Sequence, residues 1–144
     1  MNKFEKAYRE SQKIRKAFNA AKEAGSEEGM KKAKAAYQAW SEGFKGESSE
    51  FGGIYRAYEE SRDNGNEELN FKDFIRNPEE TIACLKKNGV RKFTFASGWS
   101  GAIENAWELQ QAGCRMLGMA EVKGRYDSWT EKQEVMHALV FEIA

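Results

Sequence analysis

The chain has 144 residues, and 23 Lys and Arg are balanced by 23 Asp and Glu, so its formal net charge is zero. No run reaches the roughly 18 apolar residues that cross a bilayer, and the first residues are charged rather than signal-like. These features argue against a membrane partner and predict a soluble, cytoplasmic protein of one domain with an appendage. Residues 1–46 hold 11 basic against 6 acidic side chains, whereas residues 47–80 hold 4 against 10. A basic arm and an acidic middle are therefore expected.

The first 46 residues predict two helices joined by a short turn. Apolar side chains recur at spacings of three and four up to Gly25, and Ser26 is a favourable N-cap for a second helix. The second helix continues this spacing with Met30, Ala33, Tyr37, Trp40 and Phe44. The pattern predicts an antiparallel, basic helical hairpin over residues 1–46. In one interpretation the apolar stripes of the two helices bury each other. In the other, two helices cannot bury Tyr37, Trp40 and Phe44 completely, and these side chains face the C-terminal domain, a second copy of the chain or another protein.

Residues 47–144 predict an α+β domain that follows a short polar linker. Asn77 and Pro78, followed by two glutamates, are typical of a helix start. Phe71, Phe74 and Ile75 favour a short helical turn before it. The helices are expected at residues 50–62, 78–88 and 100–112, and the strands at residues 91–96, 114–123 and 134–143.

The predicted strands and the last helix define the fold class. Aromatic and β-branched residues favour the first strand, and the last two strands form an antiparallel hairpin. Ser100 is expected to cap the helix at 100–112. The inward stripe of that helix is predicted to be Ile103, Ala106, Trp107 and Gln110. The result is an α+β fold in which a helical hairpin precedes helices and a small βαββ mixed sheet of three strands, with helices on one face.

The sequence contains no pattern typical of a catalytic or metal site. Cys84 and Cys114 lie in apolar patterns without CxxC spacing, so buried free thiols are expected. His137 is the only histidine and alternates with apolar residues. Two cysteines and one histidine are too few for a typical zinc site. We therefore expect no catalytic residues, no metal and no cofactor.

The loop at residues 97–101 is the candidate for binding a small ligand or an anion. It follows a strand and opens a helix, where backbone amides and the helix dipole attract anions. It lacks both the P-loop lysine and the GxGxxG spacing. If the last hairpin brings Tyr126 and Trp129 to the end of the sheet where Trp99 lies, the three aromatic side chains would form one binding patch. The alternative is that these side chains cover a small core. The candidate binding residues are Ser97, Trp99, Ser100, Gly101, Tyr126 and Trp129.

Several short runs carry a resemblance to a known family over about residues 51–144. They are RDNGNE at 62–67, IACLKKNG at 82–89, KFTFAS at 92–97, SG at 100–101, GCR at 113–115, GMAEV at 118–122 and RYD at 125–127. The chain resembles a family of small domains without an assigned function, common in gut Firmicutes and their conjugative and other mobile elements. The resemblance therefore implies a bacterial mobile-element setting and no particular activity.

These observations favour a non-enzymatic module that binds or regulates another protein, with an inhibitor of a host defence nuclease, such as an anti-CRISPR, as the specific version. Nucleic-acid binding by the basic hairpin is the alternative, with Lys31, Lys32 and Lys34 as phosphate contacts. We rank it lower because glutamates interrupt the basic surface. A ligand at residues 97–101 is the third interpretation. A dimer through the N-terminal hairpin stays open.

Overall fold

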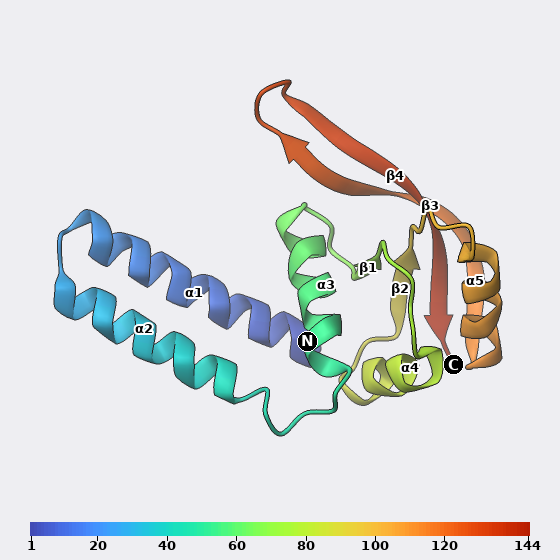
Figure 1. The fold of residues 1–144 in the computed structure, drawn as a ribbon, viewed down its shortest axis with the longest axis horizontal. Helices are drawn as coiled ribbons and strands as arrows, with labels where there is room; N and C mark the ends of the chain where they lie inside the picture. The colour runs from blue at the N-terminus through green and yellow to red at the C-terminus, as the bar shows by residue number, and fades with distance from the viewer.

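The computed structural model describes residues 1–144 as five helices and four strands (Figure 1). None of the helices combines the length and the apolarity that crossing a membrane requires. In chain order the elements are α1 (Lys3–Glu23), α2 (Glu27–Glu42), α3 (Phe51–Asp63), β1 (Asn70–Phe71), α4 (Pro78–Lys87), β2 (Lys92–Phe95), α5 (Ala102–Gln111), β3 (Cys114–Asp127) and β4 (Lys132–Ile143).

The sheet is mixed, with strand order β1-β2-β4-β3. β1 runs parallel to β2, whereas β4 is antiparallel to both of its neighbours. Phe93 lies opposite Phe141, and their rings stack with centroids 5.5 Å apart. β3 and β4 are much longer than β2, so their outer half projects beyond the sheet as a two-stranded hairpin (Figure 1). The α+β class and the β3–β4 hairpin are confirmed.

Three local expectations are wrong. The sheet has four strands rather than three, because Phe71 lies in the two-residue strand β1 instead of in a helical turn. Ser100 does not cap α5, since the helix begins one residue later and its N-cap is Gly101. The inward stripe of α5 is also misplaced, because Ile103 is 82% exposed and Trp107 is 62% exposed.

α1 and α2 form the expected antiparallel hairpin, which extends away from the sheet as a helical arm (Figure 1). Ser26 caps α2 as expected, because its hydroxyl accepts a hydrogen bond from the Gly29 amide at 3.0 Å. The arm contacts the rest of the chain only at one end. There Phe4 is fully buried and stacks on Phe51 of α3 with centroids 4.7 Å apart.

A buried ionic group fixes the same end of the arm to α3. Both carboxylate oxygens of Glu5 accept hydrogen bonds from the Arg62 guanidinium, each at 3.1 Å. Tyr58 and Arg9 also donate to this carboxylate. Burial raises the pKa of Glu5, but the hydrogen bonds from Arg62, Tyr58 and Arg9 outweigh burial and hold that pKa below its usual value near 4.5. The division of the chain into domains at residues 1–46 and 47–144 stays a prediction. The ion pair of Glu5 with Arg62 joins these two parts.

The lowered pKa gives Glu5 a defined pH signature. Stabilisation by the carboxylate is complete above about pH 4.5 and is lost as the pH falls through the lowered folded pKa. We expect Glu5→Gln to lower the free energy of unfolding by about 1–3 kcal/mol at neutral pH. The difference from wild type should shrink below pH 4.5. Urea unfolding followed by circular dichroism at several pH values measures both effects.

Glu10→Gln is the matched control for this experiment, because Glu10 is exposed on the same helix and forms no ion pair. It should change the free energy of unfolding by less than about 0.5 kcal/mol. A deficit of Glu5→Gln that stays constant from pH 7 to pH 3 would show that the carboxylate charge does not contribute.

Candidate functional sites

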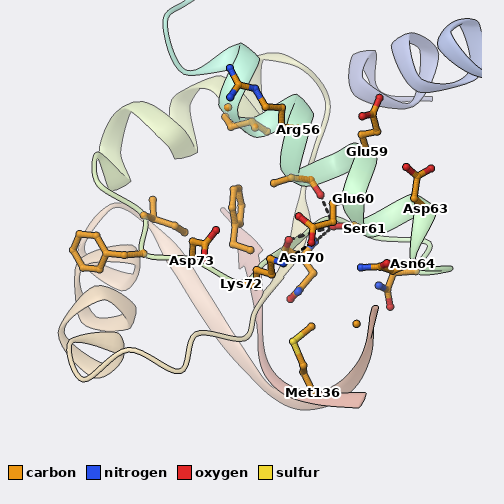
Figure 2. Close-up of a pocket in the computed structure, with 18 of the residues that line it drawn as sticks. Arg56, Glu59, Glu60, Ser61, Asp63, Asn64, Asn70, Lys72, Asp73 and Met136 are labelled. Carbon is orange, nitrogen blue, oxygen red and sulfur yellow. Dashed lines mark hydrogen bonds and ion pairs between the residues drawn. The ribbon is translucent and has the colours of Figure 1, made fainter. Parts of the chain in front are cut away.

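A polar cleft of about 840 Å³ lies between α3, the segment from β1 to the start of α4, and the β3–β4 hairpin (Figure 2). At its centre Lys72 forms an ion pair with Glu60. The hydrogen bond to Glu60 raises the pKa of Lys72, and the charges of Asp73 and Glu134 add to this against the opposing effect of partial burial. The cleft carries both signs of charge along its length, so its electrostatics select no single class of ligand.

Two side chains, one in the last turn of α3 and one in the loop after it, fix the walls of this cleft. The Ser61 hydroxyl accepts from the Asn70 amide at 2.9 Å and donates to the Ala57 carbonyl at 2.6 Å, with the Asn70 carbonyl 3.2 Å away as a second acceptor. The Asn66 side chain donates to the Lys123 carbonyl at 2.8 Å and accepts from the Lys123 amide at 2.9 Å. Each side chain therefore occupies backbone groups that an edge strand would otherwise expose. The cleft is consequently held by polar contacts on both sides.

A second concave surface, which we call the apolar groove, lies between α5 and the β3–β4 hairpin and has a volume of about 360 Å³. Its lining includes no Asp, Glu, Lys or Arg. Ile103 and Trp107 form the helix wall, and Met119 on the strand wall is 68% exposed. The full lining is Phe95, Ser97, Ala102, Ile103, Ala106, Trp107, Gln110, Met116, Met119, His137 and Leu139.

Asn105 explains why the apolar residues of α5 face this groove. Its side chain is fully buried, accepts from the Ile75 amide at 2.8 Å and donates to the Ile75 carbonyl at 2.9 Å. Residues 105 and 107 point about 200° apart on a helix, so burying Asn105 turns Trp107 away from the core. Ala106 is buried as expected, and Leu109 provides the packing that was expected of Trp107.

The loop at residues 97–101 makes few contacts. Trp99 and Ser100 are exposed, and the one side-chain hydrogen bond is from the Trp99 amide to the Ser97 hydroxyl at 3.3 Å. Neither Ser100 nor Gly101 gives α5 a side-chain cap. The loop therefore contributes Ser97 to the rim of the apolar groove, and anion binding by its backbone amides stays a prediction.

Trp99 does not meet the aromatic residues of the final hairpin. Trp99 is 64% exposed, and the aromatic ring pairs of β2 and β4 involve Phe71, Phe93 and Phe141 instead. Trp129 in the turn after β3 is 95% exposed, and Tyr126 is exposed beside it.

The candidate residues of the helical arm separate into two groups. Trp40 and Phe44 pack against Tyr55 of α3 with centroids 5.4 and 5.1 Å apart, so they contact the chain's own C-terminal part. Tyr37 stays exposed. An exposed basic surface remains without ion pairs along the arm, formed by Lys13, Arg15, Lys16, Lys22, Lys31, Lys32 and Lys34.

The titratable residues that catalysis would need are scattered. Cys84 and Cys114 are buried free thiols, and burial raises the pKa of Cys114 to about 11. His137 lines the apolar groove, with its Nε2 atom 3.9 Å from the Glu121 carboxylate. No group of His, Cys, Asp and Glu is arranged to hold a metal ion.

The fold defines a small α+β domain extended by a helical arm. A family model described as a domain of unknown function (DUF7698) matches residues 53–143, and the chain belongs to this family. Neither the curated proteins nor the solved structures include a match. The expected membership of a family without an assigned function is thus confirmed, whereas the match carries no information about organisms or mobile elements.

The burial of Asn105 gives a test of the α5 orientation. Asn105→Ala leaves two backbone groups of Ile75 without partners, so we expect the free energy of unfolding to fall by about 2–4 kcal/mol. Trp107→Ala, which removes a much larger side chain, should change it by less than about 0.5 kcal/mol. Urea titrations of both variants measure the contrast. A larger loss for Trp107→Ala would mean that α5 is rotated toward the originally expected stripe.

Proposed function

We propose that the protein is a non-enzymatic module that binds another protein through the apolar groove. The observation that supports this most is the exposure of large apolar side chains on both walls of one concave surface. Contiguous exposed apolar patches of this kind mark interaction sites in monomeric proteins. Aromatic residues and methionines are enriched at such surfaces, and Trp107, Met116 and Met119 match that composition.

The apolar groove supports protein binding better than the polar cleft does. The central charges of the cleft neutralise each other in the pair formed by Lys72 and Glu60. In the groove no neighbouring element covers Ile103 or Met119. A partner that covers these side chains gains the free energy of removing apolar area from water, about 25 cal/mol per Å² before the costs of association.

The resemblance to domains of mobile elements supports a more specific form of the proposal. In that form the protein acts in the bacterial cytoplasm, and its partner is a host protein that it inhibits or regulates. A defence nuclease is one such partner, which would make the protein an anti-CRISPR-like inhibitor. The buried free cysteines are in keeping with a reducing compartment.

Photo-crosslinking in cells of the species that encodes the chain tests the proposal. A benzoylphenylalanine at position 103 lies on the wall of the groove and should give a discrete crosslinked protein. Trp107→Ser in the same chain should reduce that product by roughly tenfold, because truncating a central aromatic anchor costs on the order of 1–2 kcal/mol or more. Mass spectrometry of the product identifies the partner.

Position 35 provides the matched control, since Ala35 is exposed on α2, outside the groove. The same crosslinker at that position should give no discrete product. Equal products at positions 35 and 103, or a product at 103 that Trp107→Ser leaves unchanged, would contradict binding through the groove.

Nucleic-acid binding is the second candidate, and the unpaired basic side chains of the arm favour it. Lys31, Lys32 and Lys34 all point into solvent without a carboxylate partner. Glu27 and Glu28 lie in the first turn of the same helix and reduce the local positive potential. The surface offers few phosphate contacts compared with an ordinary DNA-binding module.

We expect at most weak binding to duplex DNA, lost between about 50 mM and about 200 mM salt, because phosphate contacts release counterions. Fluorescence polarisation at the two salt concentrations measures this, with Lys31→Glu as the comparison variant. Submicromolar affinity that survives the higher salt concentration would rank nucleic-acid binding above protein binding.

A further inference from the structure

The walls of the apolar groove indicate how a partner segment would enter. Ala102 and Gln110 mark its extent on α5, which is about 12 Å or just over two helical turns. The opposite wall carries Met116 and Met119. Methionine side chains adapt to irregular partner surfaces, so this wall accommodates side chains of different shapes.

The outer edge of β3 does not favour an added strand. The Asn66 side chain already occupies the backbone groups of Lys123. The register between β3 and β4 is also irregular between Met116 and Gly118, where Leu117 is the extra residue. Bulges and occupied backbone groups both protect an edge against strand pairing. A partner therefore binds through side chains in the groove rather than through backbone pairing.

Three exposed acidic side chains lie on the two elements that form the groove walls. Glu104 borders the helix wall, and Glu108 follows one turn later. Glu121 stands next to the strand wall, directly opposite His137 in the register. All three carboxylates are exposed, and none has an ion pair with Lys or Arg.

The basic residues nearest in sequence to this wall are already engaged elsewhere. Arg115 forms an ion pair with Glu142 at 3.1 Å. The side chain of Lys123 lies beside Gly65, and Lys123 lines the polar cleft instead of the groove. None of the chain's lysines and arginines forms an ion pair with Glu104, Glu108 or Glu121.

We propose that the apolar groove takes an amphipathic helix of a partner protein, with apolar anchors at helical spacing and Lys or Arg beside them. This inference rests on the proposed function and adds the chemistry of the partner. Two turns of helix match the extent of the groove, and an apolar face flanked by cations complements the groove and its acidic border.

The chain's own arm is a poorer occupant than a separate protein. It is basic, but the apolar seam of α2 is already used, because Ala33 is buried and Trp40 packs on Tyr55. Binding of the arm of a second copy would appear as concentration-dependent self-association. Sedimentation velocity of the full chain over a hundredfold concentration range detects that outcome, which would overturn the inference.

A display experiment with the full-length chain tests the partner chemistry. The probe is a library of random peptides of roughly 16 residues, long enough for about four helical turns. Peptides that bind the wild-type chain are selected. Peptides that also bind the Ile103→Asp variant are then removed, because they do not depend on the groove. We expect the enriched peptides to show apolar residues at spacings of three and four with Lys or Arg beside them. Failure to enrich any peptide, or enrichment of acidic or proline-rich peptides, overturns the inference.

Charge reversal then tests the acidic border with one enriched peptide as the probe. Glu104→Lys and Glu121→Lys together should weaken its binding by roughly tenfold or more, and Glu10→Lys on the arm should leave it unchanged. Equal affinities of the three chains would remove the electrostatic part of the inference. A partner crosslinked at position 103 that carries no basic helix would refute the inference while the proposed function stands.

Discussion

The two hydrogen bonds between Asn105 and the backbone of Ile75 set the rotation of α5, and the shape of the molecule's apolar surface depends on them. A buried amide without partners would cost several kcal/mol, so Asn105 must face the one backbone segment that offers a donor and an acceptor together. Leu109, one turn later, follows it into the core. Ile103 and Trp107 are thereby directed toward β3, where the sheet leaves them uncovered.

The end of α3 has a comparable role on the other side of the molecule. Ser61 accepts from the Asn70 amide, Arg62 binds Glu5 of the arm, and Asn66 occupies the backbone groups of Lys123. One helix end and the loop after it thus connect β1, α1 and the β3–β4 hairpin. These are polar contacts between segments far apart in sequence, so they specify relative positions that apolar packing alone leaves less defined.

The sequence predicted the elements well and the long-range polar contacts poorly, for a physical reason. Periodicity reports which residues are apolar, so both hairpins and the α+β class could be predicted. It does not report that Asn105 finds a backbone partner 30 residues away. The face of α5 that contains Asn105 is less hydrophobic than the face that contains Ile103 and Trp107, so the hydrophobic pattern predicts the wrong inward face. The groove between α5 and β3 was missed for the same reason. The signal available was the spacing of Ala102, Ala106 and Leu109, which places Asn105 on the same face.

The apolar character of the groove is not a requirement of the fold. The face of α5 that contains Ala106 and Leu109 already packs in the core, and Ile103 and Trp107 lie mostly outside it. Polar residues at both positions would keep the helix, its hydrogen bonds to Ile75 and its packing. Exposed apolar side chains also favour nonspecific association, which is a cost in a free monomer. Their presence on one wall, opposite two methionines on the other, is therefore better explained by an interaction that covers them than by the stability of the chain itself.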